Sequence, residues 1–137
     1  MIGIGVMLRE LAGYESSLAA YKARVGKESS RVWISDDDAL HFRFTDGSGL
    51  CVSDQGQLCC EHRYMRTDDD LDSFVGDTLV GIQVKDAPDE VGEYGEMHEV
   101  QFLEISTNRG TFTVANHNEH NGYYGGFSIE CAIESDQ

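Results

Sequence analysis

The chain has 137 residues, enough for one domain with a small core and too few for several domains. A content of 40% hydrophobic and 26% charged residues is typical of a folded globular protein. Ten basic and 25 acidic side chains give a formal net charge of −15. Because phosphates repel such a surface, we expect no direct binding to nucleic acid or to an anionic membrane.

The first 30 residues differ from the rest in charge: they carry a net +1, whereas residues 31–137 carry −16. We expect an N-terminal helix within residues 1–30 and a strand-rich acidic domain over 31–137, in one compact domain overall. The apolar stripe along one face of this helix packs either on the domain's own sheet or, because its spacing is heptad-like, on a second copy of the chain in a homodimer. The apolar residues that predict this amphipathic helix are Met7, Leu11, Tyr14, Leu18, Tyr21 and Val25.

After Ser30 the hydrophobic period changes to two, which predicts β-strands joined by short turns such as Asp46-Gly47. A short helical turn over 70–75, capped by Thr67 or Asp68, and a polar loop over 116–122 interrupt them. The pattern predicts an α+β fold, a mostly antiparallel sheet of about seven strands with one N-terminal amphipathic helix. The expected strands lie near 40–44, 50–52, 58–64, 79–84, 98–107, 111–115 and 127–133.

The compartment is predicted from what the sequence lacks. No apolar run reaches the length of about 18 residues that a membrane span needs. The N-terminus has no basic region before its apolar stretch, so we expect no signal peptide. Four cysteines in such a chain are expected to be reduced, which indicates a cytoplasmic protein.

Cysteine and histidine form one weak candidate for a metal site. Zinc takes thiolate and imidazole ligands, usually from pairs two to four residues apart. The candidate ligands here are Cys60, His62, His117 and His120, without a C-x-x-C pair. Buried thiols and partly exposed histidines are the alternative interpretation, and we expect no cofactor.

The sequence does not favour a catalytic function. It has no G-x-S-x-G nucleophile turn and no glycine-rich phosphate loop, so a binding protein is favoured over an enzyme. A nucleotide messenger would need cations near its phosphates. The candidates in the sheet region are Arg43, Arg63, Arg66 and Arg109.

The acidic tract between Thr67 and Glu104 holds 12 acidic residues and one basic residue, Lys85. Such a field attracts cationic protein surfaces, including those that bind nucleic acid, although plain solubility is the alternative. The candidate protein-binding residues are Asp68, Asp69, Asp70, Asp86, Asp89, Glu90, Glu93, Glu96 and Glu99. In the polar and aromatic segment 116–124, Asn121, Tyr123 and Tyr124 are candidate ligand-binding residues, because tyrosine and asparagine are common in recognition sites.

Four short motifs occur in order over roughly residues 38–133: Cys59-Cys60-Glu61, the acidic turn at 70–76, the strand at 110–114 and Asn121-Gly122-Tyr123-Tyr124. In these motifs the chain resembles a family of small domains of unknown function found mostly in bacteriophages and other mobile elements. The family has an aspartate before the double cysteine, where this chain has Leu58. The resemblance implies a phage-type accessory protein with a small antiparallel fold, and it implies no catalytic residue.

These observations lead to three functional hypotheses. The first is a non-enzymatic, anti-CRISPR-like inhibitor that imitates nucleic acid and binds the basic surface of a host defence protein in the bacterial cytoplasm. The second is a protein that sequesters a small molecule or nucleotide messenger. The third is a zinc-binding domain or enzyme.

Overall fold

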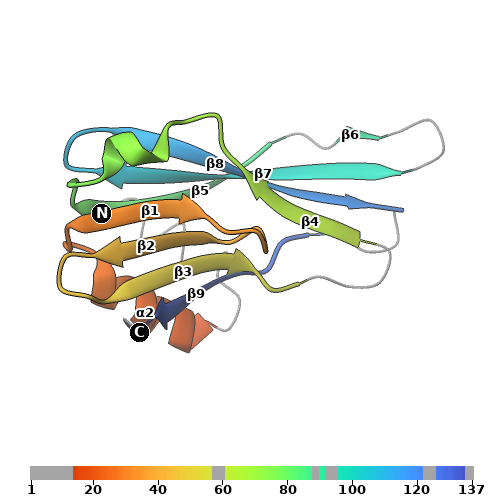
Figure 1. Ribbon diagram of the computed structural model, residues 1–137. Helices are drawn as coiled ribbons and strands as arrows, with labels where there is room; N and C mark the ends of the chain where they lie inside the picture. The colour runs from red at the N-terminus through yellow and green to blue at the C-terminus, as the bar shows by residue number, and fades with distance from the viewer. Residues whose placement is uncertain (1–13, 57–60, 88–89, 92–95, 122–125, 135–137) are drawn as a thin grey trace.

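The computed structural model describes residues 14–56, 61–87, 90–91, 96–121 and 126–134. One sheet has the strand order β1 (Ser29–Ile34), β2 (Leu40–Phe44), β3 (Gly49–Asp54), β9 (Ile129–Glu134). The other has the order β4 (Glu61–Arg66), β8 (Thr111–His120), β7 (Met97–Thr107), β5 (Leu79–Asp86), and the short strand β6 (Glu90–Val91) also pairs with β7. All of these pairings are antiparallel (Figure 1).

The two sheets pack face to face around one core. Phe42 of β2 and Phe112 of β8 meet across it, with ring centroids 6.4 Å apart. Because side chains alternate between the faces of a strand, every second residue of these strands is buried. The alternating Leu40, Phe42 and Phe44 that predict a strand are all buried in this core.

The predicted α+β fold with about seven strands is wrong. The described residues form eight strands of five or more residues and the two-residue strand β6, arranged as a sandwich of two antiparallel sheets with one short helix. The sequence pattern located most strands but carried no information on their division between two sheets, because that division depends on pairing between distant segments.

Helix α2 (Tyr14–Arg24) packs mainly against β9, and it reaches β5 of the other sheet through a hydrogen bond. Within the predicted stripe, Tyr21 is fully buried and Val25 packs against the core, while Met7 and Leu11 lie outside the described residues. The hydroxyl of Tyr21 accepts a hydrogen bond from the backbone N–H of Ile82 in β5, and Ser17 accepts one from Cys131 in β9. Since β5 and β9 end their sheets, the helix satisfies backbone donors that an edge strand leaves unpaired. Homodimerisation through the helix remains a prediction.

One local prediction is wrong, and a second is correct except for its capping residue. The polar residues 116–120 form no loop but continue β8 as far as His120. They are strand residues because Asn116 and Asn118 point inward and bind buried carboxylates. The short helical turn is a 3₁₀ helix, η1 (Leu71–Phe74), and its cap is Asp70 rather than Thr67 or Asp68. Within the described residues, no helix has the length and apolar character needed to cross a membrane.

Candidate functional site

The outer face of the β4-β8-β7-β5 sheet carries a row of aromatic and imidazole rings. Tyr64 of β4 stacks on His117 of β8, with ring centroids 4.6 Å apart and an interplanar angle of 9°. His62 lies 4.7 Å from Tyr64 on one side, and His98 of β7 lies 5.0 Å from His117 on the other. The antiparallel register explains the row, because Tyr64 and His117 are direct cross-strand partners.

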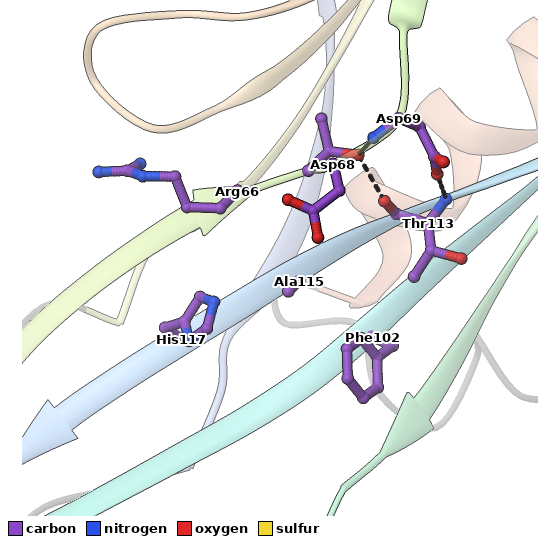
Figure 2. A pocket seen from close by; sticks show the side chains of 8 residues that line it. Arg66, Asp68, Asp69, Phe102, Thr113, Ala115 and His117 are labelled. Carbon is purple, nitrogen blue, oxygen red and sulfur yellow. Dashed lines mark hydrogen bonds between the residues drawn. The ribbon is translucent and has the colours of Figure 1, made fainter.

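A hollow of about 480 Å³ lies beside this ring row (Figure 2). Phe102 and Ala115 are cross-strand partners on β7 and β8 and give the hollow an apolar floor. The chain that leaves β4 forms its rim. The lining residues are Arg66, Thr67, Asp68, Asp69, Phe102, Thr113, Ala115 and His117.

The rim is fixed to β8 through one residue, Thr113. The Thr67 hydroxyl donates to the Thr113 carbonyl at 2.7 Å, and the Asp69 carboxylate accepts from the Thr113 N–H at 2.8 Å. Asp68 lies between these two anchors and is exposed, and Figure 2 shows its carboxylate over the hollow. Among the described residues, Asp68 has no ion-pair or hydrogen-bond partner for its carboxylate, so that charge faces solvent above an apolar floor.

Beneath the ring row, the inner face of the same strands is polar and buried. Arg63 of β4 donates to Asp54 at 2.7 Å and to Glu61 at 3.0 Å, and all three side chains are at most 4% exposed. Asn116 donates to Asp54 and Asn118 to Glu61, each at 3.0 Å. These bonds hold β4 against both β8 and β3, and so fix the position of the outer ring row.

The ionisable groups of the ring row change one another's pKa values. The Tyr64 hydroxyl donates to the Glu119 carboxylate, which lowers the pKa of Glu119. Burial, and then this bond with Glu119, raise the pKa of Tyr64 to about 12. Burial is also the main reason that the pKa of His117 is lowered, followed by the neighbouring His98, whose Nε2 lies 2.8 Å from His117 Nδ1. His117 is therefore expected to be neutral at pH 7.

Imidazole titration of His117, followed by NMR, should give a midpoint below the ordinary value of 6.5. Because the folded state binds this proton less readily than the unfolded state, His117 lowers stability as the pH falls below about 6.5. His117→Gln should remove that loss between pH 7 and 5, and His98→Ala should move the His117 midpoint upward. A midpoint at or above 6.5 would contradict the proposed burial and coupling.

The predicted acidic residues are distributed unequally. Asp68 and Asp69 reach the hollow, Asp70 caps η1, and Glu96 is exposed. Glu99 faces the interior, where it accepts hydrogen bonds from the Gly126 N–H at 2.9 Å and contacts His120 at 2.7 Å, so its carboxylate is not on the binding face. Asp86 ends β5 and Glu90 begins β6, whereas Asp89 and Glu93 lie outside the described residues.

Those predicted metal ligands that lie within the described residues do not come together in one site. His62 and His117 are on the outer face of the sheet, whereas His120 is buried on the inner face with Glu99. An odd spacing along one strand places residues on opposite faces, which separates His117 from His120. Cys60, Tyr123 and Tyr124 lie outside the described residues, and Asn121 is exposed just after β8.

The four predicted phosphate-binding arginines are scattered. Arg63 is buried in its ion pairs, Arg66 pairs with Asp38, and Arg109 pairs with Asp77 at 3.5 Å. Arg43 donates to the carbonyl of Gly47 in the β2–β3 turn. These four arginines therefore do not surround one pocket.

Sequence reasoning missed Tyr64, His98 and Phe102 as site residues. Their signal is the alternation within β4 and β7, which places them on the same face as His117 once the two strands flank β8. It also missed a group of possible metal ligands on the other sheet, His41, Cys51 and Glu134, whose ligand atoms lie within 4.8 Å of one another.

A family model described as "Domain of unknown function (DUF7448)" matches residues 21–129. The chain belongs to this family. No curated protein and no solved structure matches the chain. The match to DUF7448 includes the C-terminal end of α2, every strand from β1 to β8, and all the lining residues of the hollow.

Proposed function

We propose that this DUF7448 domain is a non-enzymatic binding protein that docks on a basic protein surface through the outer face of its β4-β8-β7-β5 sheet. The observation that carries the proposal is the exposed Asp68 carboxylate above the apolar floor made by Phe102 and Ala115. An arginine or lysine side chain of a partner can lay its aliphatic stem on such a floor and place its charge against the carboxylate.

The electrostatics of the whole chain support the same kind of partner. The formal net charge is −15, and several cationic side chains already pair with the protein's own carboxylates, including Lys27, Arg66 and Lys85. The remaining acidic excess faces solvent and steers a cationic surface toward the protein, which raises the association rate. The scattered arginines favour this function over sequestration of a nucleotide messenger.

The specific partner that we propose is the nucleic-acid-binding surface of a host defence complex, which makes the protein a phage-type, anti-CRISPR-like inhibitor. Two features support this proposal: the resemblance to domains found mostly in bacteriophages, and an acidic surface that can occupy a groove built for phosphates. Glu90 of β6 pairs with His98 of β7, so the acidic tract continues from the same sheet that carries the ring row.

The test uses bacterial strains that each carry one active CRISPR–Cas system against an infecting phage. Expression of the full chain is expected to restore plaque formation in a sensitive strain, and the purified protein to bind that strain's effector with an association rate that falls steeply as salt rises. Asp68→Lys with Glu119→Lys should abolish both effects by reversing one charge at the hollow and one beside the ring row. A second variant, in which Glu90, Glu93 and Glu96 are all changed to lysine, tests whether the charge of the acidic tract is needed for binding.

The matched control is Glu28→Lys with Glu130→Lys, which changes the net charge equally at two residues that belong neither to the hollow nor to the ring row. It should retain rescue and binding. Rescue in no strain would overturn the anti-CRISPR proposal. Full rescue by the Asp68/Glu119 variant would show that the outer face is not the docking surface.

A further inference from the structure

A second cluster of functional groups lies on the outer face of the other sheet. His41 of β2 and Cys51 of β3 are direct cross-strand partners. Glu134 of β9 pairs with Gly49, two residues from Cys51 along β3, so its side chain reaches the same place on the face. One ligand atom from each of the three residues lies within 4.8 Å of the others, and His41 Nδ1 is 2.8 Å from the Glu134 carboxylate.

We propose that His41, Cys51 and Glu134 bind a divalent transition-metal cation of the zinc type. Imidazole nitrogen, thiolate sulfur and carboxylate oxygen are the donors that zinc prefers, and the thiolate disfavours magnesium and calcium. At ordinary zinc–ligand distances, tetrahedral donors are about 3.3–3.8 Å apart. Donors within 4.8 Å therefore close around a cation by side-chain rotation, with the ion taking the place of the His41–Glu134 contact.

The surroundings of His41 orient its ring for this role. Its Nε2 lies 2.9 Å from the Ser35 hydroxyl oxygen, and that hydroxyl donates its own proton to Asp37. Ser35 must then accept a hydrogen bond from Nε2–H, which leaves Nδ1 to face Glu134 and Cys51. In the metal-free chain the Glu134 carboxylate accepts a hydrogen bond from Nδ1–H, and a cation would take the place of that proton. Metal-binding histidines are commonly held this way through their second nitrogen.

Two further features complete the site. Trp33 stacks on the imidazole of His41, with centroids 5.0 Å apart and an interplanar angle of 10°, and so restrains the ring. Asp37 and Cys51 both line a small cavity of about 100 Å³, so the Asp37 carboxylate lies near the thiol, and it or water is the candidate for the fourth ligand. The histidine and glutamate side chains are 12% and 34% exposed, so a cation can enter from solvent.

This site is separate from the proposed docking face, because the two lie on different sheets. It also uses none of the residues that the sequence pattern indicated as metal ligands. Binding would link β2, β3 and β9, and would stabilise the folded chain by an amount that grows with the logarithm of the free metal concentration.

The experiment titrates the reduced, metal-free full chain with Co²⁺, which reports thiolate ligation as a charge-transfer absorption band in the near ultraviolet. We expect one equivalent to bind, with displacement by Zn²⁺ and a higher melting temperature. Cys51→Ser should abolish the band, and Glu134→Gln should weaken binding because the amide keeps the shape but loses the charge. Ser35→Ala should keep the band but lower the affinity by about tenfold, as expected for a positioning residue.

The matched control is Cys60→Ser, since Cys60 belongs to the alternative cysteine–histidine cluster. It should bind Co²⁺ as the wild type does. Loss of the band in Cys60→Ser with retention in Cys51→Ser would overturn the proposal, and so would the absence of any thiolate band in the wild type. Circular dichroism of Cys51→Ser checks that the variant is folded, and a folded variant that retains the band also overturns the proposal.

Discussion

Replacing Arg63 by methionine is expected to lower the free energy of unfolding by about 3–5 kcal/mol. The Arg63 guanidinium lies between the Asp54 and Glu61 carboxylates, at 2.7 and 3.0 Å, with all three side chains at most 4% exposed. Methionine fills much of the arginine volume but leaves two carboxylates buried without their cation. Urea unfolding followed by fluorescence or circular dichroism measures the loss as a shift of the midpoint at constant slope.

Arg66→Met is the matched control, because Arg66 lies on the same strand and also forms an ion pair, with Asp38. Its side chain is 60% exposed, and an exposed ion pair contributes at most about 1 kcal/mol. Equal losses in the two variants would show that the Arg63 cluster is hydrated rather than buried, and that the polar interior does not hold β4 in place.

Phe112→Ala should destabilise the fold by a similar amount, about 3–5 kcal/mol. Phe112 is 1% exposed and contacts Phe42 of the opposite sheet at 6.4 Å and Phe74 of η1 at 4.7 Å between ring centroids. Removing the ring leaves a cavity where the two sheets and the 3₁₀ helix meet, and a close-packed core refills such a space only in part. Thermal or urea unfolding measures the effect.

Phe102→Ala makes the same chemical change on the next strand, but on the outer face. Phe102 is partly exposed at the floor of the hollow, so its truncation should cost about 1–2 kcal/mol. The same variant should weaken binding of a basic partner, because it removes the apolar floor. A larger loss of stability from Phe102→Ala than from Phe112→Ala would contradict the assignment of the inner and outer faces.

Local patterns in the sequence were enough to find most of the strands. The alternation of Leu40, Phe42 and Phe44 marks β2, and Asp46-Gly47 forms the turn to β3, with Gly47 at a positive φ of 88°. Both features depend on residues close together in the chain. The same reasoning failed at Asn116 and Asn118, because hydropathy assigns polar residues to solvent, whereas their partners Asp54 and Glu61 are 62 and 57 residues away.

The candidate site shows the same contrast between features that local sequence predicts and features that depend on the pairing of distant segments. The charge of the acidic tract was evident from the sequence, and Asp68 and Asp69 do lie at the hollow. Glu99 belongs to the same acidic tract but faces inward, because it occupies one of the alternate positions of β7 whose side chains point to the interior. The floor residues Phe102 and Ala115 meet through a register that spans the β7–β8 hairpin.

By itself, the sequence determined the acidic character of this protein and its richness in strands, since these follow from composition and hydrophobic period. The family also comes from the sequence, through the match of the DUF7448 model to residues 21–129. The tertiary structure decided that the strands divide into two sheets, that α2 forms hydrogen bonds with an edge strand of each sheet, and that His41, Cys51 and Glu134 come together. The reason is physical: strand pairing and packing join residues that are far apart in the chain, such as His41 and Glu134, which are 93 positions apart, and no local pattern encodes such a contact.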